Sequence, residues 1–254
     1  MPWNPDTYHK FQRERSAPFA DLLALVHVRD NLRVIDLGCG TGELTRQLAD
    51  YLPAGDVVGI DNSPQMLSRA AEYARPGLRF ELSSIEEIAG EYDLIFSHAA
   101  IHWVPDHFAL IPRLLSMLRP GGQLAVQVPS NHGHLTLRLI GELASKEPYR
   151  TALDDWKRTS PVLGIDQYAD LLFQHGGTDI TVFEKVYPHI LENADALADW
   201  TSGTALVPYF ERLPEDLRET FMQEYRTRLR AAYPTSPVFY GFRRTLFSAI
   251  RPES

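Results

Sequence analysis

The chain of 254 residues lacks the features that mark several classes of protein. Cys39 is its one cysteine, so no disulfide can form within the chain, which is compatible with a reducing compartment. No apolar run is long enough to cross a bilayer, and the N-terminal segment MPWNPDTYHKFQRERS has no apolar stretch of the kind found in secretory signals. Repeats, low-complexity tracts and long charge runs are also absent. We therefore expect a cytoplasmic globular protein with no membrane partner.

Basic residues are in short supply as well. Lys and Arg total 25 against 33 Asp and Glu, which gives a net charge of −8 at pH 7. Non-specific binding to nucleic acid needs a basic surface, so we expect no nucleic-acid partner. An acidic chain can still bind a small anionic substrate, because a few buried arginines set the local charge.

The most informative stretch is Val34-Ile-Asp-Leu-Gly-Cys-Gly-Thr-Gly42, an apolar strand that ends in a glycine-rich turn. Such a turn, followed by a helix, presents bare backbone N–H groups to a nucleotide-like ligand. A dinucleotide fingerprint would need a third glycine where Glu43 stands, and that carboxylate would repel a pyrophosphate at the helix start. The turn therefore predicts a ligand without phosphate, and S-adenosylmethionine (SAM) fits this description.

Strands and helices alternate at short intervals through the first half of the chain. This rhythm predicts a parallel sheet covered on both faces. Beyond Ser130 helices dominate, and the last strands come late, so helical insertions should form a cap over one edge of the sheet. Two breaks are expected, one at Pro18 within a helix over 4–28 and one at Pro120-Gly121-Gly122 after a helix over 106–118. The strands are expected at 32–37, 57–60, 78–82, 92–97, 123–128, 180–187 and 238–250.

This order of elements predicts one domain over residues 1–254. Its parts are an N-terminal helical lid at 1–28, a cofactor-binding half at 29–130, a sixth strand with the helical cap at 131–237, and a last strand at 238–254.

Candidate cofactor residues follow the carboxyl ends of the strands, where ligands bind in open α/β sheets. Asp61 comes about twenty residues after the glycine turn, where an acidic side chain accepts hydrogen bonds from ribose hydroxyls. Ser84 lies where an adenine would be, although it is a weaker, neutral acceptor than a carboxylate. The expected cofactor-binding residues are Asp36, Gly38, Cys39, Gly40, Asp61, Asn62, Met66, Ser84, Ile85 and His98.

Four motifs together resemble the class I SAM-dependent methyltransferases: the glycine stretch, Val58-Gly-Ile-Asp61, Tyr92-Asp-Leu-Ile-Phe96 and Leu118-Arg-Pro-Gly-Gly122. The resemblance implies a Rossmann-like α/β fold with a seven-stranded, mostly parallel sheet whose last strand is reversed.

A narrower resemblance is to the trans-aconitate 2-methyltransferases. It rests on Trp3-Asn-Pro-Asp-Thr-Tyr8, Ile101-His-Trp-Val-Pro-Asp-His107, Ala125-Val-Gln-Val-Pro129, Asp199-Trp200-Thr201 and Phe242-Arg-Arg-Thr-Leu-Phe247. It implies methyl transfer from SAM to one carboxylate of trans-aconitate. His102 departs from relatives that place glutamine there.

A carboxylate is already a nucleophile at neutral pH, so the implied chemistry needs alignment and no general base or metal. The other carboxylates need cationic partners, since an unpaired buried charge is costly. Arg243 and Arg244 begin the last strand and should point to opposite faces, and Arg15 lies on the N-terminal helix. The expected substrate-binding residues are Tyr8, Arg15, His102, Trp103, Arg243 and Arg244.

Three alternatives stay open from the sequence. The substrate could be another small acid or an aromatic metabolite; the cofactor could be NAD, which Glu43 disfavours; or the chain could bind SAM as a regulator without turnover.

Overall fold

The structure is a computed structural model that describes residues 12–253, with side chains from residue 17 onward. Within this range no helix combines the length and the apolar character that a membrane span requires. The described chain forms two compact units. The sheet unit comprises residues 17–129, 161–185 and 244–253, and the helical unit comprises residues 12–16, 130–160 and 186–243. The domain boundaries expected from the sequence stay a prediction.

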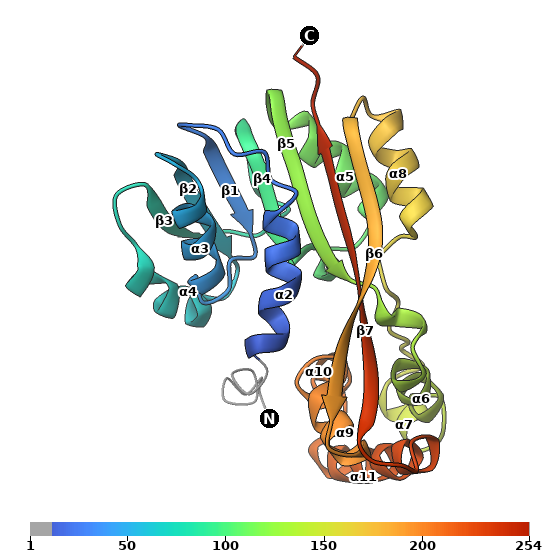
Figure 1. Ribbon diagram of the computed structural model, residues 1–254. Coiled ribbons are helices and arrows are strands. Elements are labelled where there is room, and N and C mark those ends of the chain that lie inside the picture. The colour runs from blue at the N-terminus through green and yellow to red at the C-terminus, as the bar shows by residue number, and fades with distance from the viewer. Residues whose placement is uncertain (1–11, 254) are drawn as a thin grey trace. The chain divides into compact units, whose positions relative to one another are not determined.

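The sheet has seven strands in the order β3-β2-β1-β4-β5-β7-β6 (Figure 1). Strands β1 to β5 pair in parallel, and β7 runs antiparallel to β5, which confirms the α/β fold with a reversed last strand. The strand bounds are β1 Arg33–Leu37, β2 Asp56–Asp61, β3 Leu78–Leu82, β4 Tyr92–His98, β5 Leu118–Pro129, β6 Thr178–Leu191 and β7 Val238–Ile250.

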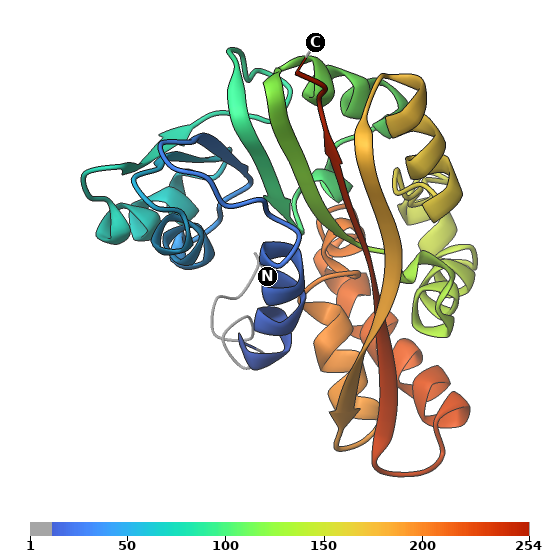
Figure 2. The same ribbon diagram turned by 45° about the horizontal axis from the view of Figure 1, so that its top comes forward.

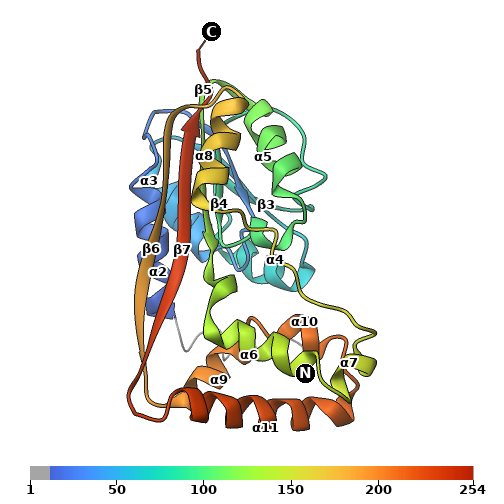
Figure 3. The same ribbon diagram turned by 90° about the vertical axis from the view of Figure 1, so that its right-hand side faces the viewer.

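Helices cover both faces of the sheet in the sheet unit (Figure 3). Apolar residues of α2 and α3 pack on one face, with Phe19, Leu22 and Leu48 buried. Those of α5 and α8 pack on the other, because right-handed crossovers on the two sides of β1 place helices on opposite faces. The bounds are α2 Gln12–Leu23, α3 Glu43–Tyr51, α4 Pro64–Ala70, η1 Ala71–Tyr73, η2 Ile101–Trp103, α5 His107–Ser116 and α8 Ile165–Gln174.

Two helix starts follow their sequence signals closely. Ser63 caps α4 by accepting a hydrogen bond from the Met66 N–H at 3.3 Å, and Pro64 takes the first helical position. Asp106 caps α5 by accepting from the Ala109 N–H at 3.2 Å. Each cap fixes the direction in which the chain leaves the carboxyl edge of the sheet.

The two expected breaks are wrong in detail. Helix α2 continues through Pro18, because the buried side chains of Phe19 and Leu22 hold it on the sheet and offset the lost backbone hydrogen bond. Helix α5 already ends at Ser116, and the segment 120–122 lies within the first part of β5 instead of stopping a helix. Gly121 has φ +73° there, and the pairing of β4 with β5 shifts register nearby.

The helical unit has its own core, made by α6, α9, α10 and α11 with the far parts of β6 and β7. Its longest helix, α11, packs against α6 and α9 (Figure 3). Phe221, Tyr225 and Leu229 recur at helical spacing along α11 and are fully buried. The bounds are η3 Asn131–Gly133, α6 Leu135–Ala144, α7 Tyr149–Ala152, α9 Ala194–Ser202, α10 Val207–Phe210 and α11 Glu215–Ala232.

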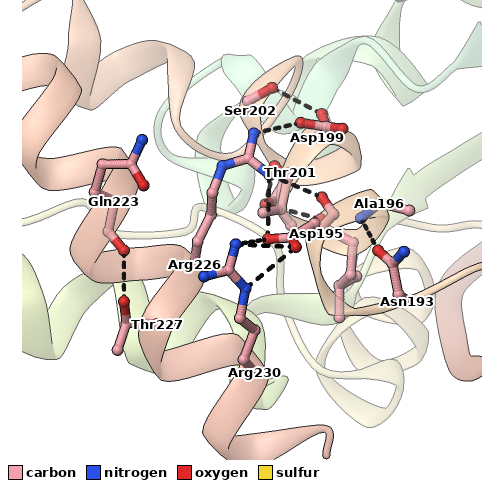
Figure 4. Close-up of polar contacts among 12 residues, drawn as sticks. Asn193, Asp195, Ala196, Asp199, Thr201, Ser202, Gln223, Arg226, Thr227 and Arg230 are labelled. Carbon is pink, nitrogen blue, oxygen red and sulfur yellow. Dashed lines mark hydrogen bonds and ion pairs between the residues drawn. The ribbon is translucent and has the colours of Figure 1, made fainter. Parts of the chain in front are cut away.

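A network of ion pairs joins α9 to α11 (Figure 4). Arg226 donates to Asp199 at 2.6 Å and to Asp195 at 3.4 Å, and Arg230 binds Asp195 at 3.0 Å through a second guanidinium. Asn193 caps α9 by accepting from the Ala196 N–H at 2.9 Å. These partners are local to the two helices, so we assign the network to the packing of this unit.

Candidate active site

The glycine turn after β1 is tightly packed at Gly38 and open at Gly40. Gly38, Gly40 and Gly42 all have positive φ, at +74°, +55° and +80°. A Cβ added at Gly38 would lie 2.3 Å from the Cβ of Ala100, in the turn after β4, whereas nothing lies within 4 Å of a Cβ built on Gly40. The turn is thus fixed against β4 at one glycine and leaves room for a ligand to approach the backbone at the next.

Asp61, at the end of β2, is bonded to this turn. Its Oδ2 accepts a hydrogen bond from the Gly40 N–H at 2.9 Å, and its Oδ1 accepts from the Ser63 N–H at 2.9 Å. Each carboxylate oxygen can accept more than one hydrogen bond, so both keep capacity for ribose hydroxyls. Asp61 therefore organises the turn and still offers the acceptors expected of it.

Asp36 lies buried on β1, below the turn. Its Oδ2 accepts a hydrogen bond from the Thr45 hydroxyl at 2.6 Å, which ties β1 to α3. Burial raises the pKa of Asp36 from 3.8 to about 7, against the lowering effect of Thr45, and the negative charge of Asp61 adds to the rise. A cation at this site would favour the ionised carboxylate.

Cys39 lies within the turn as a buried thiol. Burial, together with the charges of Asp36 and Asp61, raises its pKa well above the ordinary value. A nucleophilic cysteine needs a lowered pKa, so Cys39 contributes its backbone and its volume to the turn.

The remaining predicted cofactor residues lie at the same edge. Asn62 is exposed after β2, and Met66 is half-buried in the first turn of α4. Ser84 and Ile85 are half-buried in the segment after β3. Arg113, which the sequence did not single out, holds this segment from α5 by donating to the carbonyl oxygen of Ile85 at 3.0 Å.

The turn after β4 carries the predicted histidines. His98 is half-buried, and its ring meets Phe19 of α2 edge-on, with the ring centroids 5.6 Å apart. His102 and Trp103 lie in η2 with ring centroids 4.7 Å apart, and the indole is 57% exposed. A large exposed aromatic side chain at the carboxyl edge is suited to contact a ligand.

His107 anchors this turn and was missed as a site residue, although it ends the motif over 101–107. Its Nε2 lies 2.9 Å from the Ile101 carbonyl oxygen, and its Nδ1 lies 2.5 Å from the Tyr168 hydroxyl on α8. A carbonyl only accepts, so Nε2 carries the proton and Nδ1 accepts from the tyrosine. Burial lowers the pKa of His107, which keeps the ring neutral.

Replacing His107 with alanine is expected to destabilise the sheet unit by about 3 kcal/mol, because it leaves a cavity and unpaired buried polar groups. Tyr168→Phe removes only the hydroxyl and is expected to cost about 1 kcal/mol. Urea unfolding of the variants measures both effects. A loss below 1 kcal/mol for His107→Ala would contradict the anchoring role.

Arg243 and Arg244 lie midway along β7, so the expectation that they begin this strand is wrong, but their side chains diverge as expected from adjacent strand residues. Arg244 is 7% exposed and pairs in register with Pro129 of β5, whereas Arg243 is exposed. The Arg243 N–H donates to Asn131 Oδ1 at 2.5 Å. A buried guanidinium is the stronger candidate for a carboxylate partner. Tyr8 lies outside the described residues, and for Arg15 only the backbone, in α2, is described.

The structure therefore brings together the residues that follow β1, β2 and β4. A ligand with a ribose, a positive charge and no phosphate would find acceptors at Asp61, a carboxylate at Asp36 and an open backbone at Gly40. A depression of about 320 Å³ in the sheet unit lies at the other end of β5, around Gly121 and Gln123, and is lined by none of these three residues. We therefore expect the ligand site at the carboxyl edge of the sheet.

Comparison with known proteins gives a consistent result. The sequence model of the family described as "Methyltransferase domain" matches residues 28–177. The chain is 48% identical to a protein of Deinococcus radiodurans named trans-aconitate 2-methyltransferase, over all of both chains. It is 41% identical to a protein of that name from Variovorax paradoxus, over 92% of this chain and 91% of the relative.

Solved structures share the fold. The YcgJ protein of Bacillus subtilis matches with a TM-score of 0.61 at 15% identity, over 94% of this chain and all of that one. Phosphoethanolamine N-methyltransferase 2 of Haemonchus contortus, in complex with S-adenosyl-L-methionine, matches with a TM-score of 0.56 at 18% identity. That match covers 93% of this chain, which spans about half (52%) of the longer protein. At these identities the likeness concerns the fold alone.

Proposed function

The chain belongs to the trans-aconitate 2-methyltransferase family of methyltransferases, and we propose that it transfers the methyl group of SAM to one carboxylate of trans-aconitate. The products are a monomethyl ester and S-adenosylhomocysteine. The observation that carries the proposal is the full-length agreement with relatives of that name. The substrate in this proposal is small and anionic, and the proposed compartment is the cytoplasm, where the single buried thiol of Cys39 stays reduced.

When bound, SAM supplies an electrophilic methyl carbon on a positively charged sulfur. The residues of the chain provide position and charge. Asp61 accepts from the ribose hydroxyls, the turn at Gly38 and Gly40 lies against the ligand, and Asp36 faces its positive end. A substrate carboxylate needs no deprotonation at neutral pH, so alignment and exclusion of water suffice.

Arg244 is the proposed partner of a substrate carboxylate that does not react. Its guanidinium is buried on a strand next to β5, and two-pronged binding of a carboxylate both orients and neutralises the acid. The proposal further assigns His102 and Trp103 to the substrate side of the turn after β4. Arg15 and Tyr8, on the N-terminal segment, are proposed to complete the site.

Methyl transfer from labelled SAM to a panel of acids tests the proposed function. The panel holds trans-aconitate, cis-aconitate, citrate, isocitrate and a neutral phenol, and mass spectrometry identifies the ester. Turnover is expected to be highest with trans-aconitate. Methylation of the phenol with none of the acids would sink the proposal, and binding of SAM without any product would favour a regulator. Calorimetric titration with SAM and with NAD separates the remaining alternative.

Binding of SAM is expected to depend on pH through Asp36. In the ligand-free protein the pKa of Asp36 is about 7, so below pH 7 most of its carboxyl groups are protonated. The positive charge of SAM favours the ionised carboxylate, so below pH 7 the binding of SAM releases the Asp36 proton. The Kd for SAM should rise about tenfold per pH unit below the pKa and level off above it. Thr45 bonds the same carboxyl, and Asp61 is the nearby charge.

Calorimetry in buffers of different ionisation enthalpy measures both the Kd and the proton release. Asp36→Asn is the control, because an amide does not titrate in this pH range. Once the titration of the amino group of SAM has been corrected for, the Kd of this variant should not depend on pH. A wild-type Kd that is constant between pH 6 and pH 8 would contradict the assignment. The raised pKa of Asp36 also affects stability. Its contribution to the free energy of unfolding is largest below pH 3.8 and is lost as the pH rises towards 7.

A further inference from the structure

Strand β5 carries two buried glutamines with opposite hydrogen bonding. Gln123 is 3% exposed and fully satisfied: its Oε1 accepts from the His27 N–H at 2.8 Å, and its Nε2 donates to the Leu25 carbonyl oxygen at 2.7 Å and to the Ser248 hydroxyl at 2.8 Å. Gln127 is 0% exposed, and among the described residues neither atom of its amide has a hydrogen-bond partner.

Both side chains lie on the same face of the sheet. Side chains alternate along a strand, so residues 123, 125 and 127 of β5 point to the same face. Ala125 packs in the core beneath α2. Gln123 bonds to the segment that follows α2, which confirms the face. Gln127 therefore points towards the face covered by α2, near the carboxyl end of β5.

The register identifies the neighbours of Gln127. It lies between His98 at the end of β4 and Leu246 on β7. Arg244 pairs with Pro129, two residues further along β5, and alternation puts Arg244 on the same face as Gln127. Figure 2 shows β5, in green, between β4 and the red β7. A buried amide, a buried guanidinium and a histidine thus share one face at the carboxyl edge of the sheet.

A buried amide without partners is costly, since folding removes its bonds to water and returns none. Native proteins pair nearly all such groups, and an exception calls for an explanation. A leucine at position 127 would fill similar space at no such cost, as Leu246 does beside it. The explanation we favour is a ligand that supplies the missing hydrogen bonds.

We propose that Gln127 binds the acid substrate, its amide Nε2 donating a hydrogen bond to the carboxylate that Arg244 holds. This inference rests on the proposed function and adds a residue to it. We assign Gln127 to the substrate because it shares its face of the sheet with Arg244, the proposed substrate partner, and because β4 separates β5 from β1 and its glycine turn. His98, its neighbour on β4, would then lie between the two ligands. A neutral donor beside a cation binds a carboxylate without adding a second buried charge, which favours an acid over a neutral substrate analogue.

The test compares Gln127→Leu with Gln123→Leu in the full-length protein. Gln127→Leu is expected to raise the KM for the acid about 10- to 100-fold, with an unchanged Kd for SAM and an equal or higher thermal midpoint without ligand. Gln123→Leu is expected to lower the thermal midpoint, because three groups lose their hydrogen bonds to the Gln123 amide, and to leave the KM unchanged. Gln127→Glu should raise the KM further by charge repulsion.

Two results with Gln127→Leu would overturn the inference. An unchanged KM with a lower thermal midpoint would make Gln127 structural, and a raised Kd for SAM alone would make it a cofactor contact. If the wild type methylates a different acid, trans-aconitate is wrong as the substrate, but the KM for that acid still tests the role of Gln127. If the wild type methylates no acid, both proposals fail.

Discussion

Replacing Asp61 with asparagine is expected to weaken SAM binding by about 100-fold or more, since two charge-assisted hydrogen bonds of about 1.5 kcal/mol or more each are lost. The amide also places an N–H group against one of two backbone donors, the Gly40 and Ser63 N–H groups, which both point at the carboxylate. The substitution is therefore expected to disturb the glycine turn as well as the proposed contact with the ribose.

Calorimetry measures the Kd of this variant, and thermal unfolding reports the fold. Ser63→Ala is the matched control: it removes the hydroxyl cap of α4 but keeps the carboxylate, so it should cost about 1 kcal/mol of stability and leave SAM binding nearly intact. Asp61→Ala should match Asp61→Asn in Kd. A change in Kd below threefold for Asp61→Asn would show that the ribose is bound elsewhere.

The second large effect is expected at Arg244. Arg244→Met keeps the apolar stem and removes the guanidinium, so the KM for the acid should rise about 100-fold, from the loss of a two-pronged, charge-assisted contact worth about 3 kcal/mol. The Kd for SAM should stay constant, because the proposed partners of the sulfonium and the ribose lie on β1 and β2. Steady-state kinetics separates KM from kcat.

Arg243→Met is the control for this prediction. It removes one positive charge from the adjacent position, but from an exposed side chain on the opposite face of β7. We expect less than a threefold change in KM, in keeping with the small energies of exposed charges. If Arg243→Met raised the KM and Arg244→Met did not, the two faces of β7 would have to be exchanged in the proposal.

The sequence predicted much of the fold because its signals are local. Strands β3 and β7 have the expected bounds. Each of these depends on residues close together in the chain. The continuation of α2 through Pro18 could not be predicted, because it depends on side chains packing against strands far along the sequence.

The site divides in the same way. The glycine turn and Asp61 were located by spacing alone, whereas the bond between Gly40 and Asp61 spans 21 residues and needed the structure. The pairing of His107 with Tyr168 spans 61 residues, and no local pattern announces it. The lack of partners at Gln127, in contrast to Gln123, is likewise visible only once the strands are assembled. The roles assigned to the individual site residues stay predictions until ligands are bound.

The strand order also bears on how the protein is made. In the described sheet β7 lies between β5 and β6, yet it is synthesised last of the three. On the ribosome, one edge of β5 and the edge of β6 that pairs with β7 must stay unpaired until β7 emerges. Such exposed edges invite pairing with other nascent chains. Slow translation of residues 192–237 would lengthen this interval, so yield on overexpression should respond to codon choice in that stretch or to chaperone supply.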